Sequence, residues 1–445
     1  MKSHEPATPP PGALLDGGAP QWLGSLLFVA LSLFLWIGVT PFIDLGDISL
    51  AAPQAGRSNQ IYQLVLLTIS AAMMIFGLAH PMRNSILRPR ILLSLLLLWF
   101  LVTSMAGGYP MLGIKAIVVT TLVTINAGIY LLLPSTEQHF ARLSGICVLI
   151  MLAVAYFGII FMPGLSIHQT GDLIEPMLAG SWRGHFNHKN TAAGAMVISA
   201  FIGLYVMGQW SRLAGLLIFV LSVIFLLKTG GKTASAMLPL ILILSYIFEK
   251  IRILRIPIVS CVIGFSFLLV ASAIIRPINQ FIADLGIDAT FTNRADIWRL
   301  AYNAILERPI TGYGLKGFWQ TPELVYSGGE SWAIMAGHGH NAYLDLMLMT
   351  GIPGLMLALI WFLILPMRDI GRLTPEQQSM PLTRLFIRIW LFALYSAALE
   401  SIFFEGRNII WFMMVMALCG LRLQSRAALS VEMPRPVTRK VVAHA

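Results

Sequence analysis

The sequence predicts an all-α polytopic membrane protein with about twelve transmembrane helices. Hydrophobic residues make up 57% of the chain and charged residues only 11%, with a mean hydropathy of +0.78, whereas soluble domains carry roughly 25% charged residues. Apolar runs that approach or cross a hydrocarbon core of about 30 Å recur along the whole chain. Together these two observations place most of the protein within a lipid bilayer.

The apolar runs follow one another with short polar connections. They lie at residues 22–42, 61–79, 91–106, 111–133, 143–163, 190–208, 213–227, 233–248, 256–275, 341–366, 386–403 and 409–421. The third, seventh, eighth and last are short for a span of about 20 residues. They belong to one transmembrane domain, residues 21–421, flanked by a Pro/Gly-rich, disordered cytoplasmic tail (1–20) and a basic cytoplasmic tail (422–445).

The lysines and arginines predict the orientation of the bundle, because cytoplasmic loops carry the excess of these residues. With both termini inside, 18 of the 30 lysines and arginines fall in inner segments. Five of the others lie in one long loop, which is exempt from the rule. We therefore expect a membrane protein with both termini in the cytoplasm and its large loops on the outer side of the membrane.

Two outer loops are enlarged, at residues 164–189 and 276–340. The second loop contains apolar residues at helical spacing, which end at Pro309. These residues are Ile297, Trp298, Ala301, Ala304 and Ile305. The pattern predicts a short amphipathic helix on the membrane surface, with Arg294 near its start. We expect the function of the protein to reside where the two loops meet.

The net charge of +10 does not indicate a nucleic-acid partner. Such a partner requires basic residues gathered on a soluble face, and here they are scattered at helix ends. Anionic lipid is the expected partner of these charges.

Two dense polar segments lie directly beside long apolar runs: residues 181–190 (SWRGHFNHKN) and 337–344 (GHGHNAYL). Ionisable groups at the edge of a bilayer usually mark a site. The arginines and lysines in and near these segments can neutralise a diphosphate without a metal; they are Arg183, Lys189, Arg294, and Lys228 or Lys232. His340 or His188 can then take a proton from an attacking hydroxyl.

These groups favour transfer of a diphosphate-activated sugar to an alcohol, and the aromatic residues of the second loop suit sugar rings. A zinc site at the histidines is disfavoured, because no carboxylate accompanies them and neighbouring cations would repel the metal. A transporter of lipid-linked glycans or anions is the alternative from another class. It would show broken or polar spans near the midplane, whereas here the charge is concentrated at outer ends and in loops.

The sequence also resembles the bacterial O-antigen ligase and Wzy-type polysaccharide polymerase superfamily, in particular its exopolysaccharide-polymerase branch. The resemblance covers roughly residues 140–420 and rests on three ordered motifs. They are residues 182–190 (WRGHFNHKN), Asn293-Arg294 with Ile297-Trp298 and 309–314 (PITGYG), and 340–344 (HNAYL) followed by 351–354 (GIPG).

This resemblance implies a GT-C-like, metal-independent glycosyltransferase without a cofactor. Its donor would be an undecaprenyl-diphosphate-linked oligosaccharide, its acceptor a glycan or lipid-linked glycan, and its active site periplasmic. By motif, Arg183 and Arg294 would hold the diphosphate and His340 would be the base. Further substrate-binding residues are expected at His188, Lys189, Asn190, Lys232, His338, Asn341, Trp298 and Tyr313.

Within the superfamily, a polymerase and a ligase that transfers the glycan to lipid A-core differ only in acceptor. The histidine-lysine-asparagine run at 188–190 favours the polymerase. Glu400 and Glu405 bracket the outer end of a late apolar run, and either is expected to balance the cationic site.

Overall fold

The computed structural model describes residues 21–46, 55–86, 91–173, 175–284, 286, 291, 294–327 and 332–426. Within these ranges the chain is helical, and a helix lies in each of the twelve predicted apolar runs. Seven helical segments of the described chain are long and apolar enough to cross a membrane. The prediction of a multi-pass helical membrane protein is thus confirmed, whereas the count of twelve spans is not. Both predicted tails lie wholly or mostly outside the described residues.

The long helices that build the bundle are α1 (Gln21–Ile37), α2 (Ala55–Ala79), α4 (Ile91–Ala106), α5 (Pro110–Tyr130), α6 (Glu137–Phe161), α8 (Lys189–Gln209), α9 (Arg212–Lys228), α10 (Lys232–Lys250), α11 (Arg255–Ile274), α15 (Ala342–Leu359), α18 (Pro381–Ser396) and α19 (Ile409–Gln424). The shorter elements are α3 (Arg83–Ile86), α7 (Pro163–Ser166), η3 (Pro176–Leu178), η4 (Arg252–Leu254), α12 (Arg276–Asp284), α13 (Arg294–Glu307), α14 (Pro322–Val325), η5 (Trp332–Met335), η6 (Ile360–Ile364), α16 (Leu365–Gly371) and α17 (Pro375–Gln378).

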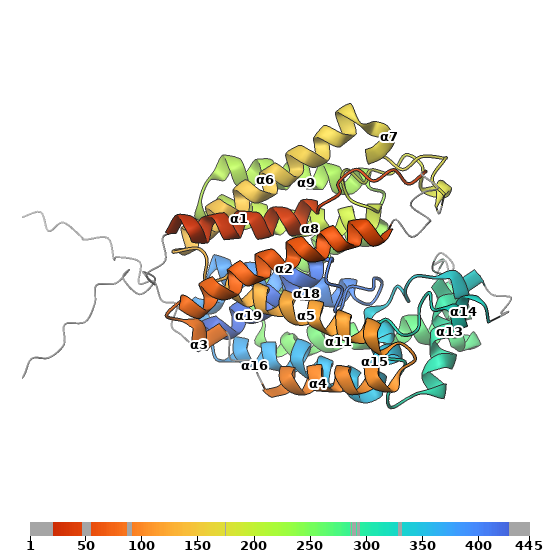
Figure 1. The fold of residues 1–445 in the computed structure, drawn as a ribbon. Helices are drawn as coiled ribbons and strands as arrows, with labels where there is room; N and C mark the ends of the chain where they lie inside the picture. The colour runs from red at the N-terminus through yellow and green to blue at the C-terminus, as the bar shows by residue number, and fades with distance from the viewer. Residues whose placement is uncertain are drawn as a thin grey trace, which may run out of the picture.

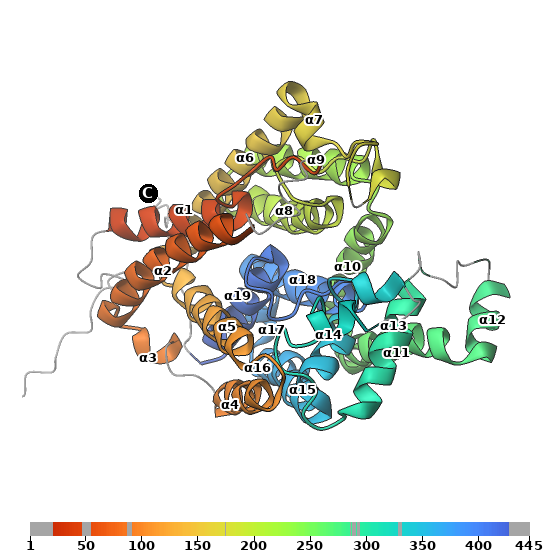
Figure 2. The same ribbon diagram turned by 45° about the vertical axis from the view of Figure 1, so that its right-hand side comes forward.

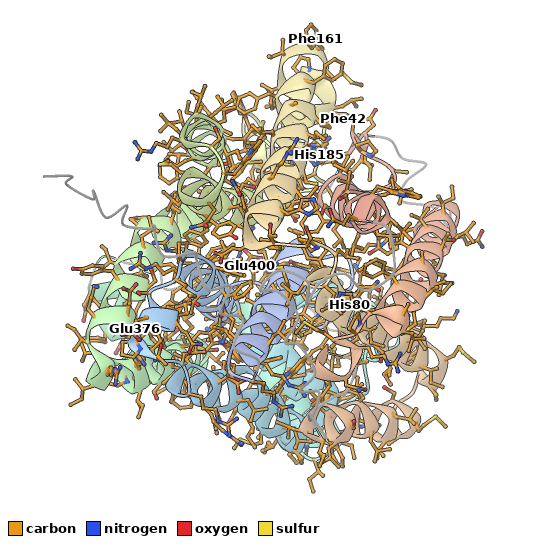
Figure 3. The ribbon with its side chains drawn as sticks, turned by 90° about the vertical axis from the view of Figure 1, so that its left-hand side faces the viewer. Phe42, His80, Phe161, His185, Glu376 and Glu400 are labelled. Carbon is orange, nitrogen blue, oxygen red and sulfur yellow. The ribbon has the colours of Figure 1, made fainter. Side chains whose placement is uncertain are left out.

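Helices α8, α18 and α19 form the centre of the bundle, and most of their residues are buried. The outer helices instead expose large apolar side chains, such as Ile75 at 71%, Phe161 at 69% and Phe267 at 71%. In Figure 3 most helices are seen end-on, and Phe161 lies at the rim. An apolar rim around a buried centre is the pattern expected of a helical bundle in lipid.

The two enlarged loops lie at the same end of the bundle. Figure 1 shows α7 of the first loop and α13 and α14 of the second at the right-hand end, opposite α3, and Figure 2 shows the bundle turned by 45°. The amphipathic helix predicted in the second loop is α13, and its apolar positions are buried. Residues 292 and 293, directly before it, lie outside the described chain.

Helix α15 is broken at Gly351, whose φ of +67° and ψ of −177° are not helical. A Cβ atom there would lie 1.9 Å from the carbonyl oxygen of Ile310, so only glycine fits. The loop after α13 packs into the break through three backbone hydrogen bonds. They run from Ile352 to Pro309, from Tyr313 to Leu348 and from Gly314 to Met349, all at 2.8–3.0 Å.

Candidate active site

The polar segment 181–188 is held firmly against its neighbours. The backbone N–H groups of Arg183 and Gly184 both donate to the carbonyl of Ser166, at 2.9 and 2.8 Å. His185 is 2% exposed, and its Nε2 lies 2.9 Å from the carbonyl oxygen of Trp36. Burial lowers the pKa of His185 to about 4, so its ring is neutral near pH 7. The segment therefore reaches α8 in a defined conformation.

The guanidinium of Arg183 lies within this packed segment. Its side chain is 1% exposed, and it donates to the carbonyl oxygens of Ile43 at 2.7 Å and Phe186 at 3.2 Å. In the described structure Arg183 thus ties the segment after α1 to residues 181–188. A direct contact between Arg183 and a diphosphate stays a prediction.

His188 caps the N-terminus of α8. Its Nδ1 accepts a hydrogen bond from the backbone N–H of Asn190 at 3.1 Å, and its Nε2 lies 2.7 Å from Oε2 of Glu175. Nε2 must then carry the proton, because Nδ1 is the acceptor. The hydrogen bond from His188 lowers the pKa of Glu175, so the carboxylate is ionised near neutral pH. Both ring nitrogens of His188 are occupied.

Arg294 is the first residue of α13, and its guanidinium contacts the segment after α18. Nη1 donates to the carbonyl oxygen of Leu399, and Nη2 lies 3.1 Å from Oε1 of Glu400. The side chain is 18% exposed. Other N–H donors of the guanidinium remain available to a ligand.

His340 lies on the opposite side of the same carboxylate. Its Nδ1 is 3.7 Å from Oε2 of Glu400, which is ion-pair range but longer than a hydrogen bond. Nδ1 is otherwise buried and unpartnered among the described residues, and no hydrogen bond of Nε2 is present there either. The ring is 29% exposed, so Nε2 is the nitrogen available to a substrate.

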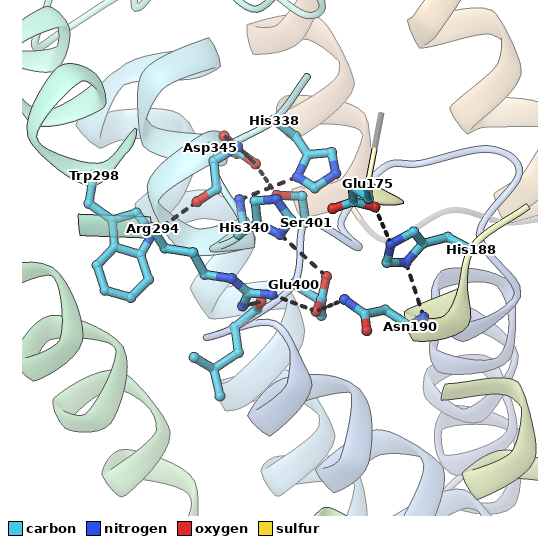
Figure 4. A network of polar contacts seen from close by, with 12 residues as sticks. Glu175, His188, Asn190, Arg294, Trp298, His338, His340, Asp345, Glu400 and Ser401 are labelled. Atoms are coloured by element: carbon cyan, nitrogen blue, oxygen red, sulfur yellow. Dashed lines mark hydrogen bonds and ion pairs between the residues drawn. The ribbon is translucent and has the colours of Figure 1, made fainter. Parts of the chain in front are cut away.

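Glu400 joins the three sequence motifs (Figure 4). Asn190 donates its side-chain amide to Oε1 at 3.1 Å, Arg294 contacts the same oxygen, and His340 faces the other. Burial alone would raise the pKa of Glu400, but His340 and the charge of Arg294 outweigh burial and lower the pKa to about 2. We refer to Asn190, Arg294, His340 and Glu400 as the Glu400 cluster.

A buried carboxylate holds the turn before His340. Asp345 is 4% exposed and accepts hydrogen bonds from the backbone N–H of Gly339 at 3.0 Å, from Trp319 Nε1 at 2.8 Å and from Ser401 Oγ. Trp298, which is fully buried, donates its Nε1 to the carbonyl of Gly339 at 2.9 Å. Both sides of this peptide segment are therefore fixed, which sets the position of the next residue along the chain.

The other predicted site residues make the following contacts. The charges of Lys189 and Lys232 lie close enough to repel each other, and Lys189 is also near Glu175. His338 packs edge-on against His340 with ring centroids 4.1 Å apart. Asn341 is fully buried and caps α15, while Tyr313 pairs with Glu307 at 2.8 Å. Substrate binding by these residues, and by His188, Asn190 and Trp298, stays a prediction.

Sequence reasoning did not single out Asp345 or Glu175. Asp345 had a signal, because it is an ionisable residue inside a predicted apolar span, and such residues usually have a role. Glu175 lies in a polar loop, where a lone carboxylate is unremarkable. Glu400 was one of two candidates, and its contacts with Asn190 and Arg294 distinguish it from Glu405, which pairs with Lys316.

Within the part of the chain that the structure describes, no group of three or more His, Cys, Asp or Glu side chains is arranged to hold a metal ion. The Glu400 carboxylate pairs with Arg294 and lies 3.7 Å from Nδ1 of His340.

A multi-pass helical bundle with a charged cluster at one end is the class of protein that this fold and site define. Residues 216–359, less than half of the chain, match the model of a family described as O-antigen ligase (Wzy_C). The matched segment includes Lys232, Arg294 and His340 and ends before Glu400. This match agrees with the resemblance over these residues, and the exopolysaccharide-polymerase branch stays a prediction. No curated protein matches the chain significantly.

Proposed function

We propose that this protein is a metal-independent glycosyltransferase of the bacterial inner membrane that joins undecaprenyl-diphosphate-linked glycan units into a surface polysaccharide. The meeting of Asn190, Arg294 and His340 at Glu400 is the observation that carries this proposal. It assembles a permanent cation, a titratable base and an orienting carboxylate at one end of an apolar bundle. This set suits a lipid-linked donor with an anionic leaving group.

His340 is the base in this proposal. The carboxylate of Glu400 faces Nδ1 and favours the tautomer that keeps the proton there, which leaves the lone pair on Nε2. His188 cannot serve in the same way without breaking its contacts, because Nδ1 accepts from Asn190 and Nε2 donates to Glu175. His188 is therefore assigned to capping α8.

The diphosphate is held by Arg294, with Lys189 and Lys232 as further cations. Helices α8, α13 and α15 each begin within one of the three motifs. The N-terminus of a helix favours negative charge nearby. Arg183, being buried, supports the loop rather than contacting the leaving group in this proposal.

The proposed transfer of the sugar requires no cofactor. The acceptor hydroxyl oxygen forms a bond to the anomeric carbon of the donor sugar, and its proton moves to Nε2 of His340. The bond between the anomeric carbon and the diphosphate oxygen breaks, and its electron pair leaves with undecaprenyl diphosphate. Glu400 stabilises the imidazolium that forms, and Arg294 stabilises the charge on the leaving group.

The site is assigned to the periplasmic side. The excess of lysines and arginines in the predicted inner segments supports this orientation. Arg294 is the first residue of α13, which lies at the end of the bundle that carries the two enlarged loops (Figure 1).

The second candidate is transfer of the glycan to lipid A-core, and the O-antigen ligase family match favours it. The donor chemistry is the same in both reactions, so the Glu400 cluster serves either. The acceptor alone distinguishes them.

Reconstitution tests the proposed function. The purified protein is placed in nanodiscs with undecaprenyl-diphosphate-linked repeat units extracted from host membranes, and the products are separated by gel electrophoresis. We expect a ladder of longer lipid-linked glycans, in excess chelator as well as without it. A product only after addition of lipid A-core would establish the ligase. Activity lost in chelator and restored by zinc would overturn metal independence, and no product under any of these conditions would overturn the function.

A further inference from the structure

A cleft of about 400 Å³ lies beside the Glu400 cluster. This is within the range of roughly 300–1,000 Å³ typical of ligand pockets. Its lining includes His338 and Ser401, the near neighbours of His340 and Glu400 in the chain, and not Arg294. We call it the α1 cleft, because the C-terminal end of α1 and the residues after it, 34–40, form one wall.

The lining of the α1 cleft combines apolar, uncharged polar and charged side chains. Phe34, Trp36 and Tyr62 contribute aromatic rings. Asn187 and Thr191 are exposed, and neither side chain makes a hydrogen bond to another described residue. Both therefore have donors and acceptors available to a ligand in the cleft.

The charged residues of the α1 cleft are already engaged. Lys316 forms an ion pair with Glu405, and the guanidinium of Arg407 lies 4.2 Å from the ring centre of Tyr62. The Glu405 carboxylate offsets Lys316 and would repel a diphosphate, which leaves Arg407, over the Tyr62 ring, as the remaining cation. The lining is therefore less suited to a diphosphate than the group of Arg294, Lys189 and Lys232. It also disfavours a polyprenyl chain, because hydrocarbon would desolvate the amide, hydroxyl and charged groups without replacing their hydrogen bonds.

A neutral sugar matches both properties, because it has apolar ring faces and hydroxyl edges. The position of the cleft fits as well. In a displacement the nucleophile approaches from the side opposite the leaving group, and the base lies on the side of the nucleophile. The cleft reaches Gly337 and His338, just before His340 in the chain. Arg294, which holds the leaving group in the proposed function, does not line it, and neither do His340 and Glu400.

We propose that the α1 cleft binds the acceptor glycan, a neutral oligosaccharide recognised through its hydroxyl groups by Asn187 and Thr191. This inference rests on the proposed function, because the acceptor has meaning only for a glycosyl transfer. It adds a binding site separate from that of the diphosphate.

Binding of glycan fragments tests the inference. The probes are oligosaccharides released by partial acid hydrolysis of the surface polysaccharide of the native host, which carry neither lipid nor diphosphate. Their affinity for the full chain in nanodiscs is measured by titration calorimetry. We expect Thr191→Val and Asn187→Ala each to weaken binding roughly three- to tenfold. Thr68→Val is the matched control, because Thr68 is an exposed helical hydroxyl outside the cleft.

Competition separates the possible occupants. Inorganic pyrophosphate and undecaprenol are expected to leave fragment binding unchanged. Displacement by pyrophosphate would make the cleft an anion site, and displacement by undecaprenol would make it a lipid site; either result overturns the inference. So would equal fragment affinity in the two cleft variants, the control and the wild type.

Product formation from the lipid-linked donor is measured in the same preparations. Product together with unchanged fragment binding in the variants would reject the cleft and leave the proposed function standing. Absence of product from the wild type would reject the function itself.

Discussion

The side-chain amide of Asn190 donates to Oε1 of Glu400 at 3.1 Å, although 210 residues separate them in the chain. Asn190 belongs to the first polar motif, whereas Glu400 follows the last but one long helix. Their contact brings the first motif to the residues that face Arg294 and His340. The site therefore depends on the folding of the whole bundle and not on the matched family segment alone.

The two histidines of the site are expected to differ in their effect on catalysis. His340→Ala removes the proposed base, so turnover should fall roughly a hundredfold or more, the usual range for a general base. His188→Asn keeps a good helix cap and should retain activity within about tenfold of wild type. Turnover is measured in nanodiscs, with the thermal unfolding midpoint as a control for folding. A greater loss in the His188 variant would transfer the base to that residue.

Glu400→Gln keeps the size of the side chain and removes its charge. We expect turnover to fall at least about tenfold, as when the carboxylate beside a catalytic histidine is neutralised. Glu376→Gln is the matched control, because Glu376 is exposed on α17 and belongs neither to the Glu400 cluster nor to the α1 cleft. Equal turnover in the two variants would remove Glu400 from the mechanism.

The pH profile should distinguish Glu400 from the base. Because its pKa is lowered to about 2, Glu400 is ionised at neutral pH, and its contribution to stability is lost only as the pH falls from about 4.5 through 2. An acid limb of activity between about pH 5 and 8 must then arise from a group other than Glu400. In Glu400→Gln this limb should move to lower pH, since an imidazolium loses its negative partner. Initial rates over this range provide the measurement, and a shift to higher pH would contradict the pairing.

Arg294→Lys should fail nearly as badly as Arg294→Ala. One guanidinium contacts both the Leu399 carbonyl and Glu400, and an ammonium group does not reproduce that fork. We expect the turnover of the two variants to agree within about tenfold. Arg299→Lys, on the same helix and half exposed beside Asp296, is the control and should stay within about twofold of wild type. Full activity of Arg294→Lys would show that only the charge matters.

Arg183→Ala separates support of the loop from direct binding of the leaving group. It leaves two carbonyl oxygens without a donor, and each unsatisfied buried group costs about 1–3 kcal/mol. We expect a lower unfolding midpoint and less folded protein, with turnover per folded molecule retained within about tenfold. Normal stability with abolished turnover would instead restore Arg183 to the diphosphate site.

Much of the fold followed from hydrophobic pattern, because every apolar run had to become a helix in lipid. The amphipathic helix after Arg294 was also predictable, since its apolar positions recur at helical spacing. The number of spans was not. Apolar length does not show whether a short helix such as α9 or α18 crosses the bilayer or is buried by its neighbours.

The site was predictable in its residue types and less so in its geometry. His340, Arg294 and Asn190 came from motifs and do lie together. The motif gave no sign that the Arg183 side chain turns inward to backbone carbonyls, because burial of a loop arginine depends on tertiary packing. The roles of Asp345 and Glu400 likewise depend on partners distant in sequence.

The break at Gly351 has a consequence for engineering chimaeric enzymes. Residues 309–314 leave the surface helix and insert their backbone into α15, the helix whose N-cap, Asn341, follows His340. If residues 309–314 were grafted into a relative, a recipient without glycine at the position of Gly351 would block their insertion sterically. A chimaera that exchanges specificity should therefore take residues 309–314 and the segment of α15 around Gly351 from the same protein.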